Sequence, residues 1–290
     1  MSKPSDTPDK DPLSDSKTDG EDGFSLSRKE KVEVERKRPP RAAVLHEIIR
    51  SDGEQELKRS ISALGWSSVA AGLSMGFSML ARGVLHRYLG DASGSFLIES
   101  LGYPLGFLLV ILSRQQLFTE NIMTAVLPVM TEPTLKNFRC FLRLWSVVLA
   151  GNLIGVSLFA FGLLHLQQFD AATQKAFVDV GEALMVNPPW QMFTKGILAG
   201  WLISMMVWML AAVEQSRFMV ILMSTYVIAI GGFTHIVVGS VEAMYLVFAG
   251  RLEFLDCVTQ FALPTLAGNI VGGSLIFALI SHAQVRSDAE

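Results

Sequence analysis

One stretch, GGFTHIVVGS at residues 231–240, places a single histidine inside an otherwise uncharged apolar run from Phe218 to Val241. Two glycines precede the histidine, so a helix through this run has reason to break there. An ionisable side chain at membrane depth, beside an interrupted helix, predicts a functional site. The alternative is a histidine that is only hydrogen-bonded within a helix bundle. The rest of the chain bears on the choice between these two interpretations.

The composition is that of a membrane protein with a soluble N-terminal tail. Half of the 290 residues are apolar and only 18% are charged, whereas soluble domains carry about a quarter charged residues. Residues 1–59 hold a large share of the charges, and the remainder consists of long apolar blocks. The formal net charge of −3 therefore averages an acidic tail with a nearly neutral membrane body.

The tail divides into three segments. Residues 1–23 are polar and acidic, lack the apolar core of a secretory signal peptide, and are expected to be disordered. A dense charged patch at residues 28–38 favours a cytoplasmic N-terminus near anionic lipid over nucleic-acid binding. Residues 41–58 predict a short amphipathic helix that lies against the membrane or a neighbouring subunit, with an interruption at Asp52-Gly53.

Six segments are apolar and long enough to cross the hydrocarbon core, which takes about 20 residues in a helix. They are 61–81, 96–113, 144–169, 196–213, 218–249 and 257–284. An even number of spans places both termini on one side. Lys and Arg are denser in the short loops 131–143 and 214–217 than in the longer loops, which favours cytoplasmic termini.

The predicted fold class is an all-α membrane protein in three parts. We expect a cytoplasmic tail over residues 1–59, a six-helix membrane domain over 60–284, and a cytoplasmic C-terminal tail over 285–290. The two cysteines, Cys140 and Cys257, fall on opposite sides of the membrane in this arrangement, so no disulfide is predicted.

An internal repeat relates the two halves of the membrane domain. LAGNLIGVSL at 149–158 recurs as LAGNIVGGSL at 266–275, with an offset of 117 residues. A second match is the dipeptide Phe-Thr, which occurs at 118–119 and again at 233–234, with an offset of 115 residues. Each unit holds three spans, an odd number, so the second copy must enter the membrane inverted. Inverted repeats with matching interrupted helices indicate a transport site near the midplane.

The two breaks have a specific electrostatic consequence. The second half-helices should start near Glu120-Asn121 and near His235, with their free amides directed at the centre of the subunit. Such an arrangement attracts an anion without a full charge in the path. Apolar constrictions are expected from Leu117, Phe118 and Phe233, and substrate hydrogen bonds from Thr119 and Thr234.

Other polar and small residues of the spans have both structural and functional interpretations. Glu120 and Glu242 are either close to the pathway or paired structurally with Arg114 or a neighbouring subunit, and we favour the structural interpretation. The repeated glycines are predicted to form close helix-packing faces rather than to line a pore; they are Gly151, Gly155, Gly268 and Gly272.

Several motifs together resemble the formate/nitrite transporter family over residues 60–284. They are LFTEN at 117–121, GFTH at 232–235, GILA at 196–199 and the duplicated Gly-Asn helix. RQQLFTEN at 114–121 and THIVVGSVE at 234–242 resemble the YfdC-like branch of bacterial inner-membrane proteins. The resemblance implies a homopentamer of aquaporin-like subunits, each with two inverted three-helix repeats and broken second and fifth helices. It also implies small monovalent anions or their weak acids as substrates, such as formate, nitrite and hydrosulfide.

The resemblance also assigns residues. The family's central histidine falls on His235, and its mobile loop falls on Leu117-Phe118-Thr119. Four positions depart from the family pattern: Thr234 stands where Glu is usual, Gly200 and Gly239 where Asn is usual, and Arg114 where a small residue is usual.

These assignments lead to a mechanistic hypothesis. Burial and a half-helix N-terminus both disfavour a charged imidazolium, so His235 should rest neutral. An entering anion would favour protonation, and His235 would then share or transfer a proton, so that a neutral acid crosses the apolar constrictions. No cofactor, metal site or nucleic-acid partner is predicted.

Anion transport has three rival functions. A water or glycerol pore of the aquaporin type would need Asn-Pro-Ala at both breaks, and neither break has it; a pore for another small neutral solute stays open. An enzyme is disfavoured, because the chain has no HExxH, Ser-His-Asp arrangement or P-loop. The third alternative is a non-transporting structural or regulatory membrane protein.

Overall fold

A computed structural model of the chain describes residues 26–90, 92–166 and 168–288. The chain forms two units, Met1–Pro39 and Pro40–Glu290. In the first unit the charged patch forms helix α1 (Arg28–Lys37). The predicted disorder of residues 1–23 lies outside the described residues.

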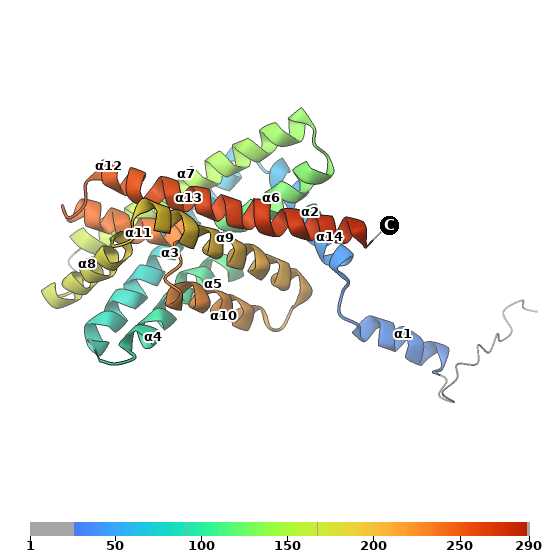
Figure 1. Cartoon of the computed structure of the whole chain (residues 1–290), viewed down its shortest axis with the longest axis horizontal. Coiled ribbons are helices and arrows are strands. Elements are labelled where there is room, and N and C mark those ends of the chain that lie inside the picture. Colours follow the sequence, from blue (N-terminus) through green and yellow to red (C-terminus); the bar gives the residue numbers. More distant parts are fainter. Residues whose placement is uncertain (1–25, 91, 167, 289–290) are drawn as a thin grey trace, which may run out of the picture. The chain divides into compact units, whose positions relative to one another are not determined.

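The second unit is a bundle of helices (Figure 1). Its elements are α2 (Ala42–Lys58), α3 (Ile61–Leu89), α4 (Ser95–Glu99), η1 (Ser100–Gly102), α5 (Pro104–Leu112), α6 (Phe118–Thr131), α7 (Leu135–His165), α8 (Ala171–Met185), α9 (Pro189–Ala212), α10 (Arg217–Ile230), α11 (Ile236–Phe248), α12 (Phe254–Asp256), η2 (Cys257–Ala262), α13 (Leu263–Ile270), η3 (Val271–Ala278) and α14 (Leu279–Ser287).

Five helical stretches of the described residues are long and apolar enough to cross a membrane, judged by length and composition. They are Ile61–Leu89, Ser95–Leu112, Leu135–His165, Pro189–Ala212 and Phe254–Ser287. The segment predicted as a single span over 218–249 forms two shorter helices, α10 and α11. Residues 231–235 separate them, which confirms the predicted break at the glycine pair.

The helices α5 and α10 end in the same way. At the end of α5 the Arg114 N–H donates to the carbonyl three residues back, and the Gln115 N–H donates to the carbonyl five residues back. Gly232 and Phe233 make the same two bonds after α10. This is a Schellman motif, whose C′ residue needs a positive φ. Arg114 has φ 54° and Gly232 has φ 60°.

Equivalent positions of the two breaks are therefore 118 residues apart, because Arg114 matches Gly232. The offset of 115 suggested by the shared Phe-Thr pair is wrong. Phe118-Thr119 form the first turn of α6, whereas Phe233-Thr234 precede α11. The first half-helix also begins earlier than expected, at Phe118 rather than near Glu120-Asn121.

An asparagine of α7 holds the start of α6. The Asn152 Oδ1 accepts the Phe118 N–H at 2.9 Å. Its Nδ2 donates to the carbonyl oxygens of Gln116 at 2.9 Å and of Ser68 at 2.8 Å. Asn152 is fully buried. One side chain thus satisfies backbone groups of the break that water would otherwise have to reach.

The same construction recurs at α11. The Asn269 Oδ1 accepts the Ile236 N–H at 2.9 Å, and its Nδ2 donates to the carbonyls of Thr234 and Gly196, both at 2.9 Å. Asn269 lies 117 residues after Asn152, within the repeated LAGN segment. The sequence repeat therefore corresponds to a repeated structural device.

The four repeated glycines lie at close helix contacts. Helix α3 packs against α7, and α9 packs against α13 and η3. A Cβ at Gly151 or Gly155 would overlap α3, and one at Gly268 or Gly272 would overlap α9. The prediction that these glycines serve packing is confirmed.

The third predicted span begins and ends differently from α7. Helix α7 begins at Leu135, nine residues before the predicted 144, because Thr134 caps it by accepting the Asn137 N–H at 3.2 Å. The first turns of α7 carry basic residues, so they do not belong to an apolar run and were not part of the predicted span. The predicted span also ran past the end of α7 at His165.

Helix α8 was not predicted at all. It lies between the predicted spans 144–169 and 196–213, and Asp170 caps it by accepting the Thr173 N–H at 2.8 Å. The segment is too polar for a search for spans to find it.

Helix α2 is continuous through Asp52-Gly53, so the predicted interruption is wrong. Its buried side chains, Leu45, Ile49 and Leu57, face the same chain, where α2 packs mainly against α6. The buried half of the amphipathic face thus meets its own bundle, whereas Val44 and Ile48 of the same face are exposed. Contact of this exposed half with the membrane or a neighbouring subunit stays a prediction.

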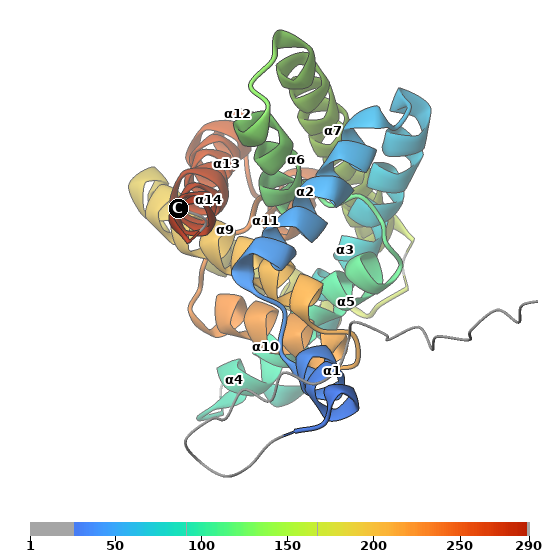
Figure 2. The same cartoon turned by 90° about the vertical axis from the view of Figure 1, so that its right-hand side faces the viewer.

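The half-helices α6 and α11 lie inside the bundle. Figure 2 shows them near its middle, with α3, α7, α9 and α13 around them. Figure 1 shows α2 and α8 at opposite ends of the bundle. The two breaks are thereby brought together in the interior, and different helices close the two ends.

Candidate functional site

His235 is the N-cap residue of α11 and is 1% exposed. Its Nδ1 accepts the Val238 N–H at 3.3 Å. Its Nε2 lies 2.7 Å from the Thr119 Oγ1 in the first turn of α6. The Phe107 ring meets the imidazole edge to face, with the ring centroids 5.0 Å apart. The histidine is therefore fixed by contacts with α5, α6 and α11.

These contacts define the tautomer. Because Nδ1 accepts a backbone N–H, the proton of the neutral imidazole resides on Nε2, and Nε2 donates to the Thr119 Oγ1. The Thr119 hydroxyl proton is then left to donate to another group. A second proton on Nδ1 would face the Val238 N–H, donor against donor, so full protonation requires loss of that cap bond.

The residues predicted as a loop opposite the histidine belong to the start of α6. Leu117 is the N-cap position of α6 and is fully buried, and Phe118 packs on Trp145 with the ring centroids 5.3 Å apart. Phe118 and Thr119 are helical. The structure therefore brings Thr119 to His235, as expected, but from a helix rather than from a loop.

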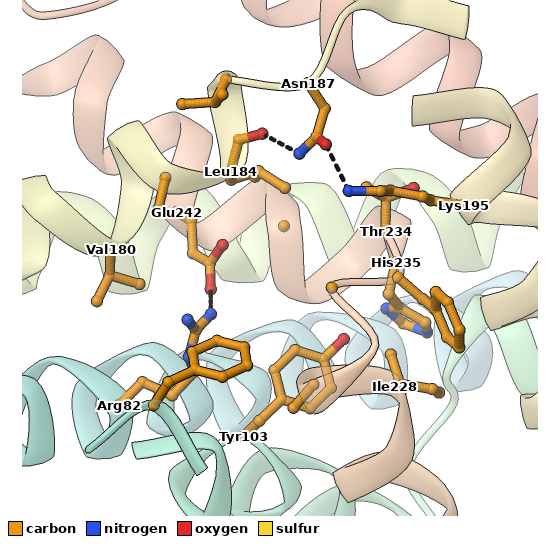
Figure 3. Close-up of a pocket in the computed structure, with 17 residues that line it drawn as sticks. Arg82, Tyr103, Val180, Leu184, Asn187, Lys195, Ile228, Thr234, His235 and Glu242 are labelled. Carbon is orange, nitrogen blue, oxygen red and sulfur yellow. Dashed lines mark hydrogen bonds and ion pairs between the residues drawn. The ribbon is translucent and has the colours of Figure 1, made fainter. Parts of the chain in front are cut away.

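A cavity of about 240 Å³ opens beside His235 (Figure 3). We call it the His235 cavity. Its lining includes Phe233, Thr234, Gly239 and Glu242. The Thr234 hydroxyl donates to the Met192 carbonyl at 2.7 Å, so its proton is already engaged, although its oxygen can still accept.

The charged groups of the His235 cavity come from several helices. Glu242 pairs with Arg82 of α3 at 2.8 Å, and Arg82 also pairs with Glu99 at 2.9 Å. Elsewhere on the cavity lining, the Lys195 Nζ donates to the Asn187 Oδ1 at 2.5 Å (Figure 3). Glu242 therefore faces the cavity and also forms an ion pair, and its partner within the chain is Arg82 rather than Arg114.

A second cavity of about 290 Å³ lies beyond Leu117. We call it the Arg114 cavity. Residues of α2, the α5–α6 turn, α6 and Arg217 line it. Among the predicted residues, Arg114, Leu117, Glu120 and Asn121 contribute to it. The Asn121 Nδ2 donates to the Gln116 Oε1 at 2.9 Å, while Glu120 makes no ion pair within the described part of the chain.

The two cavities belong to different ends of the bundle. Helix α2 contributes to the Arg114 cavity, and α8 contributes to the His235 cavity. The buried Leu117 lines the first cavity and the buried His235 lines the second. Between the cavities lie the paired starts of α6 and α11.

The sequence analysis missed several residues of this region. Asn152 and Asn269 stood inside the repeat, but only its glycines were given a role. Arg82 directly follows the predicted first span, because an apolar run ends at the first charge. No group of three or more His, Cys, Asp or Glu that could hold a metal ion occurs among the residues the structure describes.

Comparison with known proteins places the chain in a family. The family model described as formate/nitrite transporter matches residues 43–283. The chain is 53% identical over 262 residues to inner membrane protein YfdC of Escherichia coli K12, which covers 90% of this chain and 84% of that protein. It is 23% identical over 239 residues to formate channel BtFdhC of Bacillus thuringiensis, which covers 79% and 89%.

Solved structures agree on the fold. A pentameric formate channel with formate bound superposes with a TM-score of 0.66 at 19% identity, covering 82% of this chain and 99% of that chain. An ion channel of the same family superposes with a TM-score of 0.68, also at 19% identity, covering 83% and 98%. The chain belongs to the formate/nitrite transporter family.

Proposed function

We propose that this protein is a transmembrane channel or transporter for small monovalent anions of the formate, nitrite and hydrosulfide class, or for their weak acids. Relatives of the same family include a formate channel of known structure and BtFdhC. The observation that carries the proposal is the buried hydrogen bond between Thr119 and His235. It joins the starts of two half-helices at the place where two cavities approach each other from opposite ends.

The proposed path runs from one cavity to the other past Leu117, Thr119 and His235, with Phe118 and Phe233 as flanking apolar groups. The N-terminal turns of α6 and α11 direct backbone amides and positive dipole ends toward this point. The amides and the dipole ends both stabilise an anion at this point, and neither places a full positive charge in its path. Transport rather than catalysis is the function that this arrangement supports.

His235 is proposed to link transport to protons. In the resting geometry its Nε2–H donates to Thr119, which can donate in turn to an anion. An anion at this point favours the imidazolium electrostatically. Protonation at Nδ1 would release the Val238 N–H, so proton uptake would loosen the first turn of α11. The proton on Nε2 could then move through the Thr119 hydroxyl to the anion, which would leave as the neutral acid.

We further propose that the two halves are inverted three-helix repeats with broken second and fifth helices, giving six transmembrane helices in an aquaporin-like subunit. The matched asparagine contacts at α6 and α11 support the repeat. Both termini would face the cytoplasm of a bacterial inner membrane, with residues 1–59 as a tail, so the Arg114 cavity would open inward. The assembly would be a homopentamer, as in the formate channel of similar fold.

The test is anion flux into proteoliposomes across pH, with His235→Asn and Thr119→Val compared with the unmodified protein. Asparagine is a good N-cap residue, so His235→Asn retains an acceptor for the Val238 N–H and removes only the titratable ring. We expect the unmodified protein to carry formate and nitrite faster at acidic pH. The asparagine variant should lose this pH dependence, and Thr119→Val should slow flux at every pH.

Each result has a defined meaning. A flux that does not depend on pH, and that is identical in the unmodified protein and in His235→Asn, would contradict the proposed role of the histidine in linking transport to protons. Absence of flux for every anion, with a folded protein in the vesicles, would favour the non-transporting alternative. Flux of uncharged solutes but not anions would favour a neutral-solute pore.

A further inference from the structure

Tyr103 lies between η1 and α5 and lines the His235 cavity. The residue is 5% exposed, and Figure 3 shows its hydroxyl pointing into the cavity. Within the described ranges, Tyr103 is hydrogen-bonded through its backbone, and its hydroxyl bonds to no other residue. A tyrosine hydroxyl buried to this extent normally has a partner. Its partner is therefore a molecule that enters the cavity.

The other neutral polar side chains of the cavity lining are already engaged. Asn187 makes two hydrogen bonds, at 2.5 and 2.9 Å. The Thr234 hydroxyl donates to a backbone carbonyl at 2.7 Å, and both ring nitrogens of His235 have partners. Among the described residues, Tyr103 is thus the one neutral polar side chain of this lining that has no partner in the protein.

The charges of the cavity lining suit an anion. Arg82, Lys195 and Glu242 line it, two cations against one carboxylate. Glu242 is paired with Arg82 at 2.8 Å, and Lys195 has no carboxylate within 4.0 Å in the part of the chain that the structure describes. Glu99 pairs with Arg82 from outside the lining and also lies 2.9 Å from His86. The start of α11 also lines the cavity and adds the positive end of a helix dipole.

The Tyr103 side chain is held in a fixed position. The Ser78 hydroxyl donates to the Tyr103 carbonyl at 2.6 Å and accepts the Gly106 N–H at 3.0 Å. The Tyr103 ring packs on Phe107 with the centroids 5.5 Å apart, and Phe107 in turn meets the His235 ring at 5.0 Å. The hydroxyl is therefore a preorganised donor on the same side of the pathway as His235. A phenylalanine at position 103 would keep all of these contacts.

We propose that the Tyr103 hydroxyl donates a hydrogen bond to an anion in the His235 cavity and thereby selects oxyanions over hydrosulfide. A hydroxyl donates a short, charge-assisted bond to a carboxylate or nitrite oxygen, whereas sulfur is a weak acceptor. Tyr103 thus adds a second donor hydroxyl to that of Thr119. This role rests on the proposed transport function and narrows its substrate class to anions such as formate and nitrite.

The test compares the unmodified protein with Tyr103→Phe, which removes only the hydroxyl. The matched control is Tyr245→Phe, because Tyr245 is also fully buried and its hydroxyl also lacks a partner among the described residues, but it does not line the His235 cavity. One measurement is the half-saturating concentration for formate, nitrite and hydrosulfide flux in proteoliposomes. The other is the rise in melting temperature that formate causes in detergent, which reports binding without transport.

We expect Tyr103→Phe to raise the half-saturating concentrations of formate and nitrite about tenfold, the ratio that one lost hydrogen bond to a charged group gives. The value for hydrosulfide should change much less. The formate-dependent rise in melting temperature should shrink in Tyr103→Phe and persist in Tyr245→Phe. Without an anion, neither variant should melt at a lower temperature, because neither loses a hydrogen bond within the protein.

Three results would overturn the role of Tyr103. Unchanged half-saturating concentrations for formate and nitrite in Tyr103→Phe would mean that the hydroxyl meets only water. An equal rise for all three anions would exclude the selection of oxyanions. An equal formate-dependent rise in melting temperature in the unmodified protein and in Tyr103→Phe would exclude the hydrogen bond. Failure of the proposed function is distinct, since the unmodified protein would then carry none of the anions while the melting temperatures still report on Tyr103.

Discussion

At the residue scale, two asparagines hydrogen-bond the backbone groups that the broken helices leave unpaired inside the bundle. A break exposes backbone N–H and C=O groups, and in a dry interior each unpaired group is costly. Asn152 and Asn269 each offer one acceptor and two donor hydrogens, and each makes three contacts with backbone at its break or on a neighbouring helix. Alanine, serine or aspartate cannot supply that combination.

Asn152→Ala should therefore destabilise the protein by roughly 3 kcal/mol or more, because three buried backbone groups lose their partner at about 1–3 kcal/mol each. Asn269→Ala should behave alike. The matched control is Asn137→Ala on the same helix, which loses one exposed bond to the Glu132 carbonyl and should cost under about 1 kcal/mol. Denaturant unfolding in detergent gives the three values. Equal stability of Asn152→Ala and Asn137→Ala would contradict this account.

A second residue-scale feature is the ion pair of Arg82 and Glu242. Both side chains are largely buried, and Arg82 contacts Glu99 as well. Removing one partner of such a pair leaves an uncompensated charge. Glu242 thus has a structural explanation that needs no substrate, although the residue also faces the His235 cavity.

At the element scale, helix α2 owes its position to Gly53. A Cβ at residue 53 would overlap the Thr124 carbonyl of α6. The glycine thus permits close approach of two helices, whereas the sequence alone predicts a helix interruption at this position. Local sequence cannot distinguish these two uses of glycine, because the partner helix lies about 70 residues away in the chain.

Gly53→Ala should lower the stability by about 1–3 kcal/mol, the usual range for overpacking a tight contact. Gly65→Ala on α3 is the control, since a Cβ there meets nothing within 4 Å. In a helix interior that change should stabilise by about 0.5–1 kcal/mol. Melting temperatures should therefore move in opposite directions. A rise for both variants would mean that α2 can separate from α6 at little cost.

At the scale of the whole molecule, the subunit exposes apolar surface of two kinds that sequence alone does not separate. In the proposed homopentamer, some of it would face lipid and some would face neighbouring subunits. One apolar groove of about 500 Å³ runs between α7, α11 and the start of the last helix. Its lining is almost entirely hydrophobic, with Leu153, Phe161 and Met244 among its residues. Such a groove is suited to lipid or to another subunit rather than to a soluble ligand.

Native mass spectrometry from a mild detergent should give an assembly of about five times the 31.8 kDa subunit, if the proposed homopentamer is right. The mass should be independent of protein concentration over the micromolar range, as expected for a large apolar interface. A monomer or dimer at all concentrations would contradict the pentamer while leaving the single-subunit pathway intact.

The sequence by itself determined much of the architecture. Apolar run lengths identified the main helices, the glycine pair at 231–232 located the break, and a single histidine in an uncharged run marked the candidate site. The repeated LAGN segment and its glycines predicted close helix contacts, which the structure confirms. These features are local or periodic, so a linear pattern records them.

Only the tertiary structure decided which residues meet. Thr119 and His235 are 116 residues apart, and their hydrogen bond exists because two interrupted helices start at the same place. Arg82 reaches Glu242 across 160 residues, and the offset of 118 between the breaks follows from hydrogen-bond geometry rather than from matching letters. Partners of this kind depend on how helices pack in three dimensions. The stretch GGFTHIVVGS predicted a helix break and a buried histidine. Only the fold showed that Thr119, Asn269 and the two cavities surround this break.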